Sequence, residues 1–243
     1  GYRYATDVGV SFNEVRMTPI SAAGQVLLNH RILVQPATRV HSYVDYWGAA
    51  VEWFELHLPH RVLEITATSL VDTPPMPQWT PGSTWDALQG PIVTDAFGEY
   101  LHFSDYVDRG FVDGSAADLV GELRRADTPE EAARGAVDAV RERIAYEPGR
   151  TDVRTSASQA WEAGHGVCQD FSHATLALLR ALGIPARYVS GYLHTEESAI
   201  GQTVVGESHA WIEYWDGDWH AYDPTNIRGV GAAHVIVARG RDY

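Results

Sequence analysis

The sequence has little cysteine and no long apolar run, and each of these absences excludes a class of protein. Its 243 residues include a single cysteine, Cys168, which excludes an internal disulfide and indicates a reducing compartment. No apolar stretch reaches the length that spans a bilayer, and no charged and then apolar leader opens the chain. We therefore expect a cytoplasmic protein that does not act on or in a membrane.

Basic residues are also scarce. Eighteen Lys and Arg against 32 Asp and Glu leave a formal net charge of −14. Nucleic acids and anionic membranes are bound through basic surfaces, so neither is expected as a partner. An acidic surface suits a basic or neutral substrate, although solubility alone explains it. With 45% hydrophobic residues, the chain can bury one large core or two modest ones.

The first half of the chain has the composition of β-strands. Residues 2 to about 112 are rich in Val, Ile, Thr and aromatics, and much of this part alternates apolar with polar positions. Gly48 predicts the turn of a hairpin over residues 46–51, and five prolines mark residues 72–91 as a loop. We expect a sandwich-like β-domain over residues 1–114. Its predicted strands cover 4–15, 31–34, 40–46, 50–58 and 62–71.

After Gly114 the apolar pattern changes to that of helices. Thr128 is a predicted N-cap, Pro129 follows at the first helical position, and Glu130 and Glu131 complete an acidic first turn. Helices followed by an antiparallel meander, without a βαβ rhythm, indicate an α+β domain over residues 115–243. The expected helices lie near 119–123 and at 129–144, 158–161 and 168–182. The expected strands lie at 187–193, 208–215, 219–222 and 233–237.

Cys168 stands where a glycine-bracketed loop turns into an apolar helix. A helix start leaves backbone N–H groups unpaired and favours a thiolate over a thiol. Taken alone, a single cysteine is more often a small buried hydrophobe. Phe171, Thr175, Leu178 and Leu182 form an apolar stripe along this helix, which predicts a helix buried on most sides with its first turn at a cleft.

A predicted hairpin supplies two partners for this thiol. Asp216-Gly217 reads as a two-residue turn between the strands at 208–215 and 219–222. Counting outward from that turn places His209 near Asp223 across the two strands. Cysteine catalysis needs a base that holds the thiolate and a third group that orients the base. The hairpin therefore sets an imidazole beside a carboxylate.

Four segments closely resemble the bacterial transglutaminase-like family. These are Gly166-Val167-Cys168-Gln169-Asp170-Phe171-Ser172-His173, residues 183–192, Ser208-His209-Ala210-Trp211 and Asp223-Pro224-Thr225-Asn226. Residues 13–16 and 45–48 resemble the β-domain that precedes the core in one branch of that family. Members of the branch usually continue past the point matching residues 238–243, so we expect further residues beyond Tyr243.

The resemblance implies a papain-like transglutaminase core with a Cys-His-Asp triad. Cys168 would be the nucleophile, His209 the general base and acid, and Asp223 the orienting carboxylate. The thiolate would attack an amide or thioester carbonyl to give an acyl-enzyme thioester. The oxyanion would be held by the Cys168 backbone N–H and by a side-chain donor upstream. Tyr146 and Trp161 are the candidates for that donor.

Other residues near the motifs have plainer interpretations. Gln169 and Asp170 lie in the first helical turn, where an acidic residue complements the helix dipole, and a role in substrate binding is the alternative. Trp211 packs the sheet or lines the cleft. His165 is a second candidate base, whereas His173 is expected to face the core.

No metal or cofactor is expected. His57 and His60 lack a completing ligand pattern, and the sequence contains no acidic calcium loop.

Three functions remain open. An amidase or peptidase that acts on a protein, peptide or amide substrate is favoured. An acyltransferase, which crosslinks proteins or makes amides from carrier-bound acyl groups, is the alternative. A non-catalytic binding module is disfavoured because all three triad residues are present. Specificity would come from the loops at 72–91 and 195–207, the second of which is a predicted mobile flap. The substrate and the oligomeric state are not predicted.

Overall fold

The computed structural model describes residues 1–75, 82–194, 201, 207–226 and 228–243. The chain divides into two compact units, which we describe separately. The first comprises Gly1–Pro75, Gly191–Gly206 and Ala232–Arg239, and the second comprises Met76–Ser190, Glu207–Gly231 and Gly240–Tyr243. Within the described residues, no helix is both long and apolar enough to cross a membrane.

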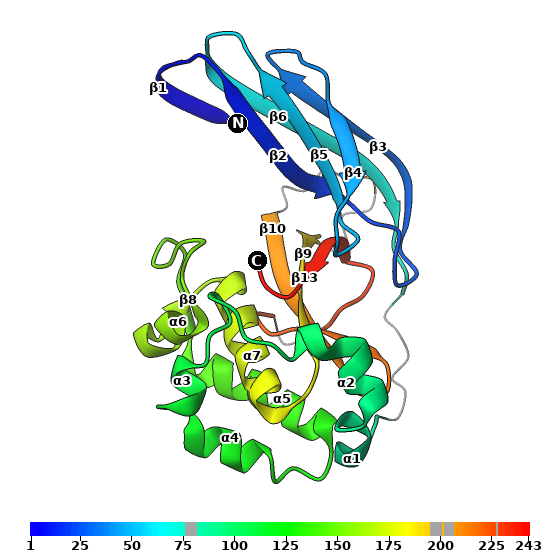
Figure 1. Ribbon diagram of the computed structural model, residues 1–243, viewed down its shortest axis with the longest axis vertical. Helices are drawn as coiled ribbons and strands as arrows, with labels where there is room; N and C mark the ends of the chain where they lie inside the picture. The colour runs from blue at the N-terminus through cyan, green and yellow to red at the C-terminus, as the bar shows by residue number, and fades with distance from the viewer. Residues whose placement is uncertain (76–81, 195–200, 202–206, 227) are drawn as a thin grey trace. The chain divides into compact units, whose positions relative to one another are not determined.

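The first unit contains two three-stranded antiparallel sheets, drawn in blue to cyan in Figure 1. Their orders are β1-β6-β3 and β2-β5-β4. Both sheets contribute to one small core, built from Val34, Phe54, Leu56 and Leu63. The predicted sandwich-like domain is therefore present. The strands are β1 (Tyr2–Val8), β2 (Ser11–Thr18), β3 (Val26–Gln35), β4 (His41–Val44), β5 (Ala50–Leu56) and β6 (His60–Asp72).

Two features of this unit can be compared with the sequence patterns. The hairpin at Gly48 is confirmed: Val44 pairs with Ala50, and Gly48 adopts a φ of +83°, which a side chain would disfavour. The single strand predicted over residues 4–15 is wrong. It is two strands, because the chain breaks at Gly9 and Val10 to pass from the sheet of β6 to the sheet of β5.

The prediction of strands up to residue 112 is also wrong. Residues 85–113 contain the helices α1 (Trp85–Leu88), α2 (Pro91–Phe97) and α3 (Gly110–Asp113) and the short 3-10 helix η1 (Gly98–Tyr100). These helices pack in the second unit, so the change expected at residue 114 occurs near residue 75. Thr84 caps α1, and Pro91 is the first residue of α2. A proline that excludes a strand is equally suited to begin a helix.

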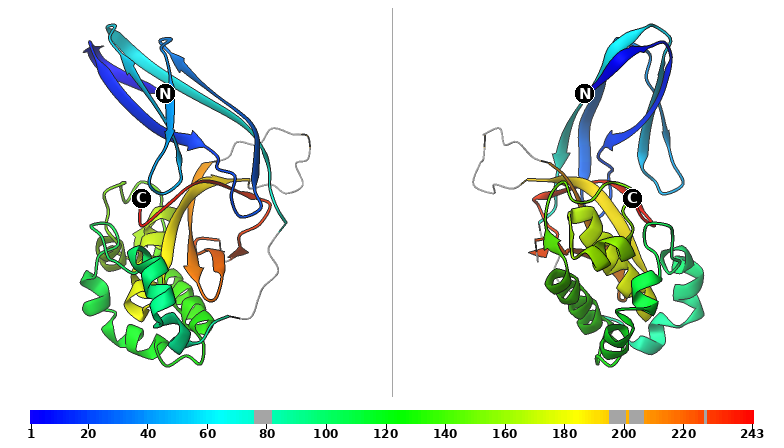
Figure 2. Two further views of the ribbon diagram at one scale, coloured as in Figure 1. Left: turned by 45° about the vertical axis from the view of Figure 1, so that its right-hand side comes forward. Right: turned by 90° about the vertical axis from the view of Figure 1, so that its left-hand side faces the viewer.

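The second unit packs helices against an antiparallel sheet, as predicted. Within this unit the strand order is β12-β11-β10-β9, and α7 contacts α5, α6 and β10. Figure 2 shows the helices on one face of β10 and β11. The other elements of this unit are α4 (Ala117–Leu123), α5 (Pro129–Arg143), β7 (Ala145–Tyr146), α6 (Ala157–Ala163), β8 (His165–Gly166), α7 (Cys168–Leu182), β9 (Ala186–Leu193), β10 (Glu207–Trp215), β11 (Trp219–Asp223) and β12 (Arg228–Gly229). The last strand of the chain, β13 (His234–Gly240), belongs to the first unit except for Gly240.

The helix starts follow the predicted capping chemistry. The Thr128 hydroxyl accepts a hydrogen bond from the Glu131 N–H, and Pro129 opens α5. The helix ends at Arg143, because Ala145 and Tyr146 form the strand β7 in parallel with β8. This short ladder fixes the segment that leads into α7. Almost the whole of α7 is buried, which confirms the prediction from its apolar stripe.

Candidate active site

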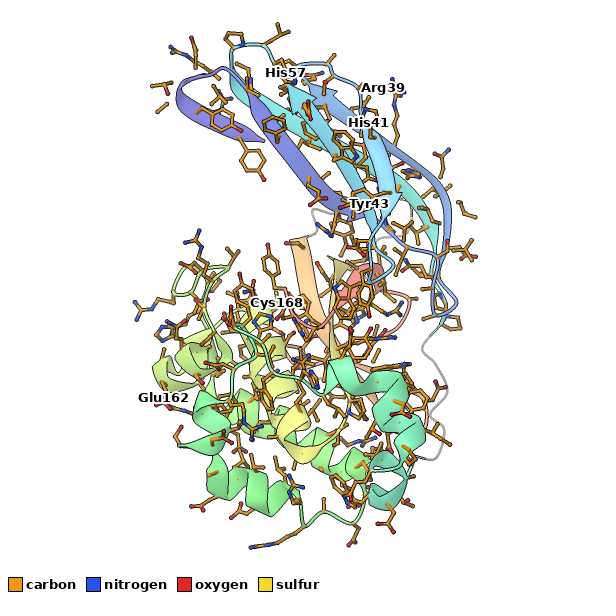
Figure 3. All side chains as sticks on the ribbon, viewed as in Figure 1. Arg39, His41, Tyr43, His57, Glu162 and Cys168 are labelled. Atoms are coloured by element: carbon orange, nitrogen blue, oxygen red, sulfur yellow. The ribbon has the colours of Figure 1, made fainter. Side chains whose placement is uncertain are left out.

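Cys168 is the first residue of α7 and is half-buried (Figure 3). Its backbone N–H belongs to the first turn, where no carbonyl of the same helix can accept it. The loop before it is fixed from inside the helix. The Asp170 carboxylate accepts hydrogen bonds from the Val167 N–H and the Thr151 hydroxyl, both at 2.7 Å through Oδ2. The position of the thiol is therefore set by its own helix.

Asp170 and Gln169 are both buried and both engaged inside the protein. Burial raises the pKa of Asp170, while its hydrogen bonds from Val167 and Thr151 oppose that shift. The Gln169 amide donates a hydrogen bond of 3.2 Å to the Val153 carbonyl. These contacts hold residues 151–153 against the start of α7. The role in substrate binding stays a prediction for both residues.

His209 and Asp223 meet across the hairpin of β10 and β11. The ladder pairs Ile212 with Tyr222, which brings the end of β11 beside the beginning of β10. The His209 Nε2 lies 2.8 Å from the Asp223 Oδ2. Their side chains are 9% and 0% exposed, so water competes little for this hydrogen bond.

The hairpin loop differs in one detail from the predicted two-residue turn. Trp215 pairs with Trp219, so Asp216, Gly217 and Asp218 form a three-residue loop. Gly217 adopts a φ of +83°, the left-handed conformation that a three-residue hairpin loop needs. The extra residue leaves His209 and Asp223 within hydrogen-bonding distance.

The His209 imidazole bridges the carboxylate and the thiol. Burial lowers the pKa of His209, but hydrogen bonds with Asp223 and with the Cys168 side chain outweigh it and raise the pKa to about 9. Because Nε2 is occupied by Asp223, Nδ1 is the ring nitrogen left for the thiol. The structure therefore brings the three predicted residues into one hydrogen-bonded row. Such a row can hold a thiolate beside an imidazolium.

The Asp223 carboxylate is saturated with donors. Oδ1 accepts from the N–H groups of Thr225 and Asn226, and Oδ2 accepts from His209 and from the Asn226 side-chain amide. Each oxygen therefore accepts two hydrogen bonds from groups within the protein. The arrangement is suited to orienting an imidazole.

The two candidate oxyanion donors occupy different surroundings. Tyr146 pairs with Gly166 in the β7–β8 ladder and is 52% exposed. Trp161 is buried in the helical core, where its ring stacks on Phe111 with centroids 4.6 Å apart. Tyr146 is thus next to the loop that carries Cys168, and the packing favours it over Trp161.

The remaining candidates lie around the site. Trp211 is fully buried, with its ring centroid 6.1 Å from that of His209. His165 is half-buried in β8. His173 faces the core, as predicted, and burial lowers its pKa to about 3. Residues 76–81 of the first specificity loop and nearly all of the predicted flap at 195–207 lie outside the described residues.

Sequence reasoning missed two supporting residues. One is Asn226, whose side-chain amide donates to Asp223. The Asp-Pro-Thr-Asn segment could have indicated a turn here, because an aspartate commonly accepts from the backbone N–H two residues ahead. Thr151 donates to Asp170 from 19 positions away in the sequence. No local pattern identifies that contact.

The chain is similar to several known proteins. Residues 117–224 match the model of the transglutaminase-like superfamily core, and residues 1–72 match the bacterial transglutaminase-like N-terminal region. An uncharacterised protein of Mycobacterium leprae, ML0607, is 41% identical over 244 residues, covering 100% of this chain and 86% of its own length. Rv2569c of Mycobacterium tuberculosis is 31% identical, covering 100% of this chain and 81% of its own length.

Two further proteins share parts of the fold or the sequence. The crystal structure of a candidate cysteine protease from Cytophaga hutchinsonii superposes with a TM-score of 0.79 at 23% identity, covering 99% of this chain and 78% of that one. A protein-glutamine gamma-glutamyltransferase of Pseudomonas aeruginosa is 33% identical over 119 residues, which are 44% of this chain and 17% of that protein. Both family models and the full-length relatives lead to one conclusion: the chain belongs to the transglutaminase-like superfamily.

Proposed function

We propose that the protein is an amidase or peptidase that cleaves amide or thioester bonds of a protein, peptide or other amide substrate through a cysteine acyl-enzyme. The observation that carries this proposal is the row of Cys168, His209 and Asp223, with the thiol at the start of α7. The raised pKa of His209 keeps its imidazole protonated at neutral pH. The nucleophilic sulfur and a proton donor then stand side by side before substrate arrives.

In the first half-reaction, the Cys168 thiolate attacks the carbonyl carbon and a C–S bond forms. The carbonyl oxygen becomes an oxyanion, which the Cys168 backbone N–H and the Tyr146 hydroxyl would hold. Removing one such donor costs about 3–4 kcal/mol of transition-state stabilisation. The His209 imidazolium donates its proton to the leaving nitrogen, the C–N bond breaks, and the amine departs.

In the second half-reaction, water replaces the departed amine. Neutral His209 takes a proton from the water as its oxygen attacks the thioester carbonyl. The C–S bond then breaks and the carboxylic acid product leaves. The thiolate and the imidazolium are restored, and Asp223 holds the imidazole in one orientation throughout.

The second candidate function is acyl transfer. It is favoured by the 33% identity over 119 residues to the Pseudomonas protein-glutamine gamma-glutamyltransferase. In that reaction a primary amine attacks the thioester instead of water, and His209 takes the proton from the amine. The first half-reaction is the same for both functions, so they differ only in the group that enters second.

A glutamine-containing peptide, offered with and without a primary amine, separates the two functions. A hydrolase releases ammonia and leaves glutamate without incorporating the amine, whereas a transferase forms the substituted amide. Mass spectrometry of the peptide distinguishes the products, and Cys168→Ala is the inactive control. Alkylation by iodoacetamide tests the shared step. If Cys168 reacts at about pH 6 no faster than a free thiol, the catalytic role of the row is wrong.

A further inference from the structure

The sheet β2-β5-β4 carries exposed aromatic side chains around a hollow of about 400 Å³. Phe12, Tyr43 and Trp53 line it and are 73%, 44% and 37% exposed. Trp53 alternates along β5 with the buried Phe54, so it points to the opposite face of the sheet. Exposed aromatic clusters of this kind mark binding surfaces more often than isolated apolar residues do.

The strand register sets the arrangement of the rings. His41, Trp53 and Glu14 occupy one row across β4, β5 and β2. The His41 ring stacks on the Trp53 ring, with centroids 4.5 Å apart and an interplanar angle of 16°. Figure 3 shows His41 and Tyr43 along β4. His41 comes from β4, on one side of β5, and covers one face of the Trp53 indole. Glu14 and Phe12 come from β2, on the other side of β5, and they line the hollow beside the second face of the indole.

The charge of the hollow is negative. Glu14 and Glu55 line it, and none of the lining residues in the described part of the chain is basic. Glu14 accepts a hydrogen bond from the Tyr43 hydroxyl. Arg16 lies 3.7 Å from Glu14 but closer to Asp45, at 3.0 Å.

Glu55 has a histidine neighbour. Its Oε2 lies 2.9 Å from the His57 Nε2, and both side chains are exposed to solvent. Exposed pairs of this kind contribute little to the free energy of folding and exchange partners readily. Both carboxylates can therefore accept from a cationic guest.

We propose that this hollow, which we call the aromatic-acidic pocket (Phe12, Glu14, Tyr43, Trp53 and Glu55), binds an arginine side chain of a protein or peptide partner. A planar guanidinium can stack on the free face of Trp53 while its N–H groups donate to the carboxylates. A quaternary ammonium has no N–H to donate, and an ammonium lacks the planar face. The pocket uses no residue of the Cys168 row, so the inference does not depend on the proposed function.

The test is a titration of the full chain with the capped tripeptide Gly-Arg-Gly, followed by NMR. The same peptide with citrulline keeps the shape of arginine and removes the charge, and a lysine peptide keeps the charge and removes the plane. We expect the arginine peptide to bind about tenfold tighter than the citrulline peptide. Its affinity should fall as salt is added, because salt screens the charges.

Matched variants locate the binding. Glu55→Gln and Trp53→Ala are each expected to lower the affinity for the arginine peptide about tenfold. Glu64→Gln, an exposed carboxylate on β6 of the same unit, should leave the affinity unchanged. Circular dichroism checks that the variants fold, and the conservative Glu55→Gln change keeps the test valid if Trp53→Ala does not fold. Cys168→Ser should bind as the unchanged protein does, whatever becomes of catalysis.

Three results would overturn the proposal. One is equal binding of the arginine and citrulline peptides. Another is unchanged affinity in both Glu55→Gln and a folded Trp53→Ala. The third is binding of a neutral oligosaccharide with no binding of the arginine peptide, which would make the aromatic face a sugar-stacking surface instead.

Discussion

At the scale of single residues, the hydrogen bond with Asp223 contributes most among the contacts that raise the pKa of His209. The imidazole is 9% exposed, and burial by itself would favour the neutral ring. Hydrogen bonds with Asp223 and Cys168 reverse that preference and move the pKa from 6.5 to about 9. Below about pH 9 the ring therefore holds its proton, and above that pH it becomes neutral.

Asp223→Asn tests this contribution. The amide keeps an oxygen for the Thr225 and Asn226 N–H groups but removes the negative charge beside the imidazole. We expect the pKa of His209 to fall from about 9 toward 6.5, so that the ring is largely neutral at pH 7.5. The measurement is an NMR titration of the His209 Cε1–H signal, assigned with His209→Gln.

Glu122→Gln is the matched control for that titration. Glu122 is an exposed carboxylate on α4, so its loss should leave the His209 midpoint unchanged. An identical midpoint in Asp223→Asn and in the unchanged protein would show that Asp223 does not set the protonation of the imidazole.

The sequence indicates the candidate reactive residues more readily than the residues that support them. Cys168, His209 and Asp223 could be selected because the hairpin pairs the last two and because the segments around all three resemble the transglutaminase-like family. Thr151 could not be selected, because its bond to Asp170 depends on how the loop at 151–153 folds back on α7. Trp161, a candidate oxyanion donor, is a core residue in the structure, which its sequence position does not reveal.

At the scale of elements, the loop before α7 depends on a close approach between Gly166 and Asp170. A Cβ added at Gly166 would lie 2.6 Å from the Asp170 Cβ, far inside contact distance. Asp170 is the residue that accepts from Val167 and Thr151. A side chain at Gly166 would therefore displace the group that fixes Cys168.

We expect Gly166→Ala to destabilise the protein by about 1–3 kcal/mol. It should also slow the alkylation of Cys168, because the hydrogen bonds that hold the loop are displaced. Urea unfolding measures the first effect, and the rate of reaction with iodoacetamide measures the second.

Gly121→Ala in α4 is the control for Gly166→Ala. A Cβ at Gly121 meets nothing within 4 Å, and alanine in a helix is favoured over glycine by about 0.5–1 kcal/mol. This variant should be at least as stable as the unchanged protein. If Gly166→Ala behaves in the same way, the close approach has no structural role.

Elements defined by local chemistry were predictable, and those defined by long-range pairing were less so. Thr128 and Pro129 predicted the start of α5, and Gly48 predicted its hairpin. The strand over 4–15 was divided wrongly, because the choice of sheet at Gly9 depends on partners far along the chain. Pro91 indicated a loop, but it begins the helix α2. Proline disfavours a strand, yet it is compatible with both a loop and the first turn of a helix.

At the scale of the whole molecule, the chain returns to its first unit near its end. The Gln25 side chain donates to the Ile236 carbonyl at 2.9 Å and accepts from the Ile236 N–H at 2.8 Å. These residues are 211 positions apart, and both belong to the first unit. Gln25 is 3% exposed, so water cannot replace these hydrogen bonds.

Gln25→Ala is therefore expected to destabilise the protein by about 2–3 kcal/mol, because it removes the acceptor of the buried Ile236 N–H. Urea unfolding of the full chain measures the change. Gln89→Ala, at an exposed position after α1, should change the stability by less than about 0.5 kcal/mol. Equal stability of the two variants would contradict the structural role of Gln25.

The sequence by itself indicated the fold class and a β-domain ahead of a helix-and-sheet core, and its resemblance to the transglutaminase-like family indicated the three candidate residues of the site. The elements depend on periodicity, capping and hairpin register, and the resemblance depends on short sequence motifs, all of which are local properties of the chain. Only the tertiary structure decided that residues 85–113 pack with the second unit and that residues 232–239 return to the first. Only the tertiary structure likewise showed that Thr151 donates to Asp170 and that the aromatic-acidic pocket forms on its sheet. Each of these depends on contacts between distant parts of the chain, and local patterns carry no information about which distant residues will meet.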